Sequence, residues 1–103
     1  MSDMEEVIRR EMIDATYAGR TTPTLCNKVI RSFYPQRRKT KFLLDESDNT
    51  YPQWMRSVIV GKYDDQLLGS RGFGNVALVQ LKEFYAREIE LQVVLYQDHG
   101  SHI

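Results

Sequence analysis

The first segment of the chain carries a helical pattern of apolar and polar positions. Apolar residues recur along one face at spacings of three or four residues, at Met4, Val7, Ile8, Met12 and Ile13. Charged residues occupy the opposite face, and either Ser2 or Asp3 can cap the first turn. Gly19 suits the end of this helix, because glycine readily adopts the conformation found there. The pattern predicts a first helix over roughly residues 3–17.

Two further helices are indicated by proline and threonine near their starts. Threonine caps a helix well and proline is tolerated in its first turn, so Arg20–Thr24 predicts the start of a second helix. Pro35 ends that helix, because proline excludes the preceding residue from the helical region. Pro52 predicts a third helix that runs to Gly61. The apolar residues that these two helices carry are Leu25, Val29, Ile30 and Phe33, then Trp54, Met55, Val58 and Ile59.

The sequence around Gly72-Phe73-Gly74 predicts two helices joined by a tight turn. Asp64–Leu68 has the pattern of a short helix, and a longer one capped by Asn75 runs to about Arg87. One glycine allows a positive φ at the reversal, the other lets the backbone approach a neighbour, and Phe73 fills the space between the helices. Free N–H groups at the start of the second helix suit a phosphate oxygen. The apolar positions of that helix are Val76, Leu78, Leu81, Phe84 and Tyr85.

Beyond Arg87 the pattern changes from helical to alternating. Residues 89–96 alternate as an extended segment does, and residues 97–103 are expected to be a flexible tail. The predicted fold class is therefore all-α: a compact bundle of four or five short helices that contains a helix-hairpin-helix and ends in a short extended tail. We expect one domain over residues 1–96. Its core is expected to combine Trp54 with Leu67, Leu68, Phe73, Leu78, Leu81 and Phe84.

Composition narrows the class of protein. The 103 residues suffice for one domain with one core, and 42% hydrophobic with 27% charged residues is an ordinary globular composition. Cys26 is the only cysteine, and no grouping of side chains has the spacing of a metal site, so we expect no metal and no cofactor. The acidic start lacks the apolar core of a secretory signal, and no apolar stretch approaches the ~20 residues of a membrane span. A cytoplasmic protein without membrane contact is expected.

Charge is unevenly distributed although the formal net charge is zero. A basic segment places five cations between positions 31 and 41, at Arg31, Arg37, Arg38, Lys39 and Lys41. Such a block is typical either of a solvated surface or of a patch that attracts phosphate groups. An acidic, turn-rich loop over residues 45–50 follows it and has the character of a solvated connection.

A leucine pair, a short spacer, a glycine turn and an amphipathic helix follow one another within Asp65–Tyr85. This arrangement resembles the final helix-hairpin-helix of the C-terminal domain of the bacterial RNA polymerase alpha subunit. Thr24–Val29 is similar to the DNA-contacting helix of that family, with Asn27 at the family's asparagine. The resemblance implies an all-helical fold and a role in DNA binding or transcription.

The chain departs from the family pattern at positions that hold DNA in the family. A basic pair and a serine follow the hairpin glycine there, whereas this chain has Asn75-Val76-Ala77. The arginine that the family inserts into the minor groove would align near Thr24, and the nearest arginines are Arg20 and Arg31. The departures favour a protein partner, whereas the clustered cations favour DNA.

Other chemistry-bearing residues have simpler interpretations. Cys26 lies among apolar residues with no histidine nearby, so it is expected to pack as a small hydrophobe rather than act as a nucleophile. Trp54 and its neighbours are expected in the core rather than on a partner surface. The carboxylates of 45–48 lack the glycine and terminal glutamate of a calcium loop. Because no nucleophile or acid–base constellation is found, we expect no enzyme.

The sequence thus predicts a small accessory module that contacts DNA phosphates without reading bases. The alternative is a module that binds a protein of the transcription machinery and no nucleic acid. Backbone amides at the hairpin would hold one phosphate, and the basic segment would add non-specific attraction. The residues predicted to contact nucleic acid are Asn27, Arg31, Arg37, Arg38, Lys39, Lys41, Arg71, Gly72, Gly74 and Asn75.

Overall fold

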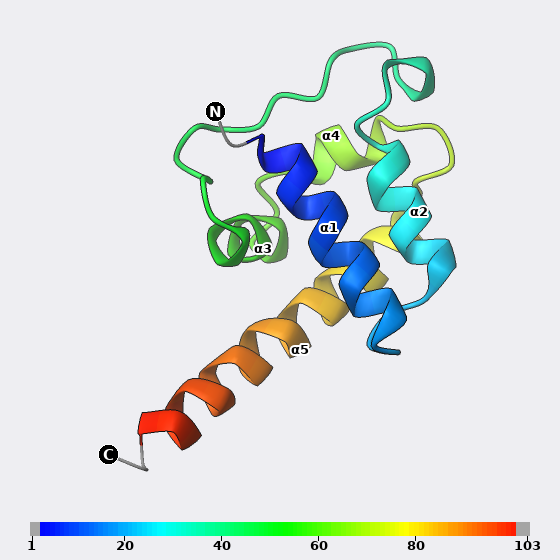
Figure 1. Ribbon diagram of the computed structural model, residues 1–103. Helices are drawn as coiled ribbons and strands as arrows, with labels where there is room; N and C mark the ends of the chain where they lie inside the picture. Colours follow the sequence, from blue (N-terminus) through cyan, green and yellow to red (C-terminus); the bar gives the residue numbers. More distant parts are fainter. Residues whose placement is uncertain (1–2, 101–103) are drawn as a thin grey trace.

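The computed structural model describes the backbone of residues 3–100 and the side chains of residues 3–95. This part of the chain is all-α, as predicted, and contains no strand (Figure 1). One short 3-10 helix separates the second and third α-helices. The elements are α1 (Met4–Tyr17), α2 (Pro23–Arg31), η1 (Pro35–Arg37), α3 (Tyr51–Ile59), α4 (Asp64–Leu68) and α5 (Asn75–Gly100).

Local capping sets where the first three α-helices begin. The Asp3 carboxylate accepts a hydrogen bond from the Glu5 amide at 3.0 Å, which confirms Asp3 as a cap of α1; Ser2 lies outside the described residues. The Thr22 hydroxyl accepts from the Leu25 amide at 3.2 Å at the start of α2. At the start of α3 the Thr50 hydroxyl accepts from the Gln53 amide at 3.3 Å. Both α2 and α3 carry a proline in the first turn. The predicted starts of these helices are confirmed.

One core joins all five α-helices around Trp54. The Trp54 indole is fully buried, and its ring centroid lies 4.7 Å from that of Tyr63. Its Nε1 donates a 2.9 Å hydrogen bond to the Tyr85 hydroxyl on α5, so the buried polar end of the indole has a partner. The core confirms Cys26 as a buried small residue. It also holds most of the predicted hairpin residues: Leu67, Phe73, Leu78, Leu81 and Phe84.

Leu68 corrects one expectation about that core. Its side chain is 37% exposed, whereas neighbouring Leu67 is fully buried. Successive residues of a helix point about 100° apart, so a helix as short as α4 can direct only one of its two leucines into the core.

The C-terminal segment is helical, and the predicted extended segment over residues 89–96 is wrong. α5 continues without a break from Asn75 to Gly100, and its second half projects away from the other helices (Figure 1). No glycine or proline interrupts residues 76–99, and once a helix has started each further residue adds a hydrogen bond at little cost. The backbone of residues 97–100 therefore belongs to the helix, whereas the remainder of the expected tail, 101–103, lies outside the described residues. None of the helices in residues 3–100 is both long and apolar enough to cross a membrane.

The acidic loop is anchored rather than merely solvated. Asp48 is buried, and its carboxylate accepts hydrogen bonds from the hydroxyls of Ser57 and Tyr63 and pairs with the Lys62 ammonium at 2.9 Å. Burial opposes ionisation of Asp48, but these partners together lower its pKa below the usual value. The connection between η1 and α3 is thereby fixed to the start of α4.

Candidate functional site

α4 and α5 are joined by a turn over residues 69–74, the segment for which the sequence predicts a hairpin. Gly72 has a φ of 83°, which a side chain strongly disfavours, and Phe73 between the glycines is buried in the core. Gly74 has no such φ, and a Cβ atom added there would meet nothing within 4 Å. The reversal therefore depends on Gly72, and the close backbone approach expected of the second glycine is not found.

The basic segment lies directly against this turn. The Arg71 amide donates a 2.7 Å hydrogen bond to the Arg37 carbonyl oxygen. Arg38 and Ser70 form an isolated antiparallel bridge beside it. Figure 1 shows the η1 segment next to the turn between α4 and α5. Two parts of the sequence that were predicted to contact phosphates independently are thus held together by main-chain contacts.

A depression of about 320 Å³ lies where the two segments meet, and we call it the cationic groove. Its lining consists of Gln36, Arg37, Arg38, Lys39, Leu68, Gly69, Ser70 and Arg71. Four of these residues are cationic and none is acidic. Among the side chains described, no carboxylate forms a salt bridge with Arg37, Lys39 or Arg71. The groove therefore combines a concave shape with uncompensated positive charge.

Arg38 differs from the other groove cations because hydrogen bonds hold its guanidinium in place. Its Nε donates to the Thr40 carbonyl at 2.6 Å, and its Nη1 donates to the Ser32 carbonyl at 3.0 Å. The guanidinium carbon lies 5.0 Å from the centroid of the Phe42 ring. Burial lowers the pKa of Arg38, although an arginine remains protonated at neutral pH. Arg38 thus supplies a fixed charge, whereas Lys39 and Arg71 are exposed.

The remaining predicted contact residues lie elsewhere. Arg31 and Lys41 are exposed and do not line the groove. Lys41 lines a neighbouring hollow together with Glu5 and the groove residues Arg38 and Lys39. Asn27 lines a hollow between α1 and α2 together with Cys26. The structure therefore gathers four of the ten predicted residues at the groove and distributes the others over several surfaces.

The start of α5 retains part of the expected phosphate geometry. The Leu78 amide bonds back to the Gly74 carbonyl at 3.0 Å, so Gly74 occupies the cap and Asn75 is the first helical residue rather than the cap. The amides of Gly72 and Gly74 donate no hydrogen bond to any described residue. Asn75 lines an apolar depression that also includes Glu83, so no cation of the groove adds to the helix end there.

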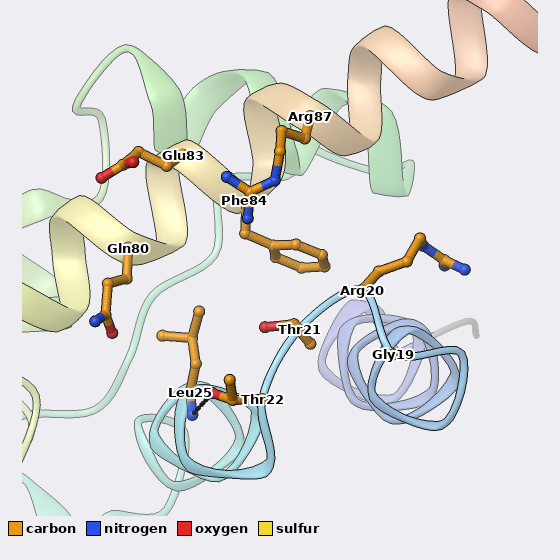
Figure 2. Close-up of a pocket in the computed structure, with 9 residues that line it drawn as sticks. All are labelled: Gly19, Arg20, Thr21, Thr22, Leu25, Gln80, Glu83, Phe84 and Arg87. Carbon is orange, nitrogen blue, oxygen red and sulfur yellow. Dashed lines mark hydrogen bonds between the residues drawn. The ribbon is translucent and has the colours of Figure 1, made fainter.

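A further depression lies between the start of α2 and the middle of α5. Figure 2 shows the Phe84 ring between Arg87 and Thr21, while Arg20 extends away from the ring. Arg20 donates two hydrogen bonds to the Glu88 carboxylate, from Nε at 2.8 Å and from Nη2 at 3.2 Å, and hydrogen bonding to Glu88 is the main cause that raises the Arg20 pKa. An arginine near the position that the family inserts into the minor groove is therefore neutralised within the chain.

Sequence reasoning missed Ser70. This serine is only 4% exposed, and its hydroxyl has no hydrogen-bond partner among the described residues. No local signal distinguishes it, because its burial depends on the contact with Arg38 on another segment.

No protein-family model, curated protein or solved structure matches the chain. The similarity to the RNA polymerase alpha subunit domain therefore stays a prediction.

Proposed function

We propose that this protein is a small accessory module that binds the phosphate backbone of DNA through the cationic groove, without reading bases. One observation carries this proposal: main-chain contacts between Arg37 and Arg71, and between Arg38 and Ser70, bring four cations around one concave surface. A surface of this kind attracts phosphates and releases their counterions, whatever the base sequence.

The zero net charge is compatible with this function because acidic side chains are engaged elsewhere. Asp45 and Asp48 pair with Lys62, Asp64 pairs with Lys82, and Glu88 pairs with Arg20. The groove cations have no such partner among the described residues, so a local positive potential remains in a neutral molecule. Its affinity should be modest and should fall steeply as salt is added.

A role in transcription is supported by the arrangement of α4, its turn and α5. The pair of helices joined through a glycine of positive φ agrees with the hairpin expected from the resemblance to the alpha subunit domain. The phosphate-binding charge, however, comes from the basic segment before α3 rather than from the first turn of α5. We infer a module that contacts DNA beside the hairpin instead of at its helix end.

The proposal can be tested by titrating two unrelated labelled duplexes at low salt with wild type and with a triple variant, Arg37→Gln, Lys39→Gln and Arg71→Gln. Removing three phosphate contacts should lower affinity for both duplexes by at least tenfold. A matched control carries Arg10→Gln, Lys28→Gln and Arg56→Gln, which change the net charge equally but lie outside the groove lining.

The control should lose clearly less affinity than the groove variant. Equal losses in the two variants would show that overall charge, rather than the groove, attracts DNA. Absence of wild-type binding at low salt would refute the proposal, because electrostatic attraction is strongest there.

A second candidate function, binding a protein partner, is favoured by the projecting half of α5. Leu91, Val94 and Leu95 are exposed and continue the face on which Phe84 packs into the core. An uncovered apolar stripe of this kind fits a partner helix, for instance in the transcription machinery. Leu91→Ser with Leu95→Ser should then abolish co-purification with RNA polymerase and leave DNA affinity unchanged. Retention of RNA polymerase by this double variant would remove the support for this candidate.

A further inference from the structure

We propose that Arg38 and Ser70 form the floor of a discrete pocket for a single phosphate group within the cationic groove. The inference deepens the proposed DNA-backbone function and rests on it for the nucleic-acid form of the ligand. It distinguishes a pair of donors at the floor, Arg38 and Ser70, from the other three groove cations, Arg37, Lys39 and Arg71.

The backbone bridge between Arg38 and Ser70 places their side chains together. Residues directly opposite each other in an antiparallel pair project to the same face, with Cβ atoms about 5 Å apart. Both residues line the groove. The Arg38 guanidinium and the Ser70 hydroxyl therefore belong to two segments of the chain that the bridge holds side by side at the groove.

Arg38 offers a donor that the protein itself does not use. Its Nε and Nη1 bond to carbonyl oxygens, but Nη2 donates to no described residue and no described carboxylate balances the charge. Nη2 faces the turn, since a Cβ added at Gly69 would stand 3.5 Å from it. A partly buried guanidinium normally has an anionic partner, and this one has free N–H groups on the groove side.

Ser70 provides the second, independent indication of a ligand. Its hydroxyl is buried without a partner among the described residues, an arrangement that costs free energy. Rotation about a single side-chain bond can direct the hydroxyl toward the groove. A phosphate oxygen would accept from both Ser70 and Arg38, while the other three groove cations neutralise the remaining charge.

The ligand chemistry, a tetrahedral oxyanion, has two sources that an experiment can separate. Wild-type protein, labelled with ¹⁵N, is titrated with inorganic phosphate, with an oligonucleotide bearing a 5′-phosphate, and with the same oligonucleotide lacking it. Shifts of the Arg38 Nε–H and Ser70 amide signals report binding. A preference for the phosphorylated oligonucleotide identifies a terminal phosphate, whereas equal affinities identify the phosphodiester backbone.

Ser70→Ala is the decisive variant, because it removes only an unpartnered hydroxyl. We expect about a tenfold loss of phosphate affinity, as for one hydrogen bond to a charged group, with no loss of thermal stability. Ser32→Ala is the matched control: that buried hydroxyl already bonds to the Val29 carbonyl, so this change should lower stability and leave phosphate affinity intact. Arg38→Lys, which keeps the charge but loses the fixed donors, should weaken binding as Ser70→Ala does.

Unchanged affinity of Ser70→Ala for every probe would overturn the pocket. If that result came with normal DNA binding by wild type, the proposed DNA function would stand without a discrete pocket. Conversely, saturable binding of inorganic phosphate that depends on Ser70, without any binding of duplex DNA, would support the pocket and refute the DNA function.

Discussion

The Arg71 amide donates a 2.7 Å hydrogen bond to the carbonyl oxygen of Arg37, and this bond joins segments that lie on opposite sides of α3 and α4 in the sequence. The cationic groove exists because of this connection. Its four cations come from two segments, so their spacing depends on the conformation of the turn over residues 69–74. Stability of the turn and binding at the groove should therefore respond together to substitutions that distort the turn.

Gly72→Ser should destabilise the protein by about 1–2 kcal/mol, because a side chain at a φ of 83° meets its own backbone. Gly74→Ser is the matched control. Gly74 has an ordinary φ and precedes α5, where serine is a good cap, so stability should stay within about 0.5 kcal/mol of wild type or rise. Urea unfolding followed by Trp54 fluorescence measures both. Equal effects of the two substitutions would show that the positive φ does not limit the turn.

Leu67 and Leu68 provide a test of the core assignment with chemically identical substitutions. Leu67→Ala should cost about 2–5 kcal/mol, since truncating this fully buried side chain leaves a cavity in the core. Leu68→Ala should cost less than about 1 kcal/mol, because this side chain already contacts solvent. Thermal unfolding of the two variants compares them directly. A larger loss for Leu68 would mean that α4 is rotated relative to the described core.

Most of the fold could be predicted from the sequence because the signals are local. A cap such as Asp3 or Thr22 and a proline in the first turn act within one helical turn, and these predictions are confirmed. The segment after Arg87 was misassigned because its alternation fits a strand equally well over a few residues. The conformation of this segment is set by the helix that begins at Asn75 and extends into it, and a short stretch of sequence after Arg87 does not include that start.

The candidate site could be predicted only in part. The cations of the basic segment are recognisable as a cluster in the sequence. Their order along the chain does not predict which of them line the groove beside the turn over residues 69–74. That selection follows from the bridge between Arg38 and Ser70, a contact between distant segments. Two further features depend on contacts between distant segments and could not be predicted from the sequence. They are the unpartnered hydroxyl of Ser70 and the pairing of Arg20 with Glu88.

The Asp48 network should make stability depend on pH in the acidic range. Hydrogen bonds and Lys62 lower the pKa of Asp48, and hydrogen bonds from Ser47 together with Lys62 lower that of Asp45 to about 2. A carboxyl whose pKa is lower in the folded state stabilises the protein above its unfolded value, about 3.9. That stabilisation should be lost as the pH falls from about 4 toward 2. Unfolding titrations at several pH values would show the decline.

Asp48→Asn measures how much the Asp48 carboxylate alone contributes to the free energy of unfolding. At neutral pH it should lower stability by about 1–3 kcal/mol, because two hydroxyls and an ammonium lose a charged acceptor. As the pH falls below about 4 the difference from wild type should shrink gradually, since wild-type Asp48 takes up a proton only as the pH passes through its lowered pKa. A difference that stays constant from pH 7 to pH 2 would attribute the effect to packing rather than to ionisation.

Salt dependence should separate the groove from the rest of the basic segment. Neutralising Arg37 or Arg71 singly should make the slope of log affinity against log salt shallower by up to about 0.9, the value for one phosphate contact on duplex DNA. Arg31→Gln and Lys41→Gln serve as controls, because these cations belong to the same block of sequence but lie outside the groove. They should shift affinity slightly and leave the slope nearly unchanged, since a charge that does not line the groove adds general attraction without a phosphate contact there. Equal slope changes at all four positions would mean that DNA follows the whole basic segment and that the groove has no special part in binding.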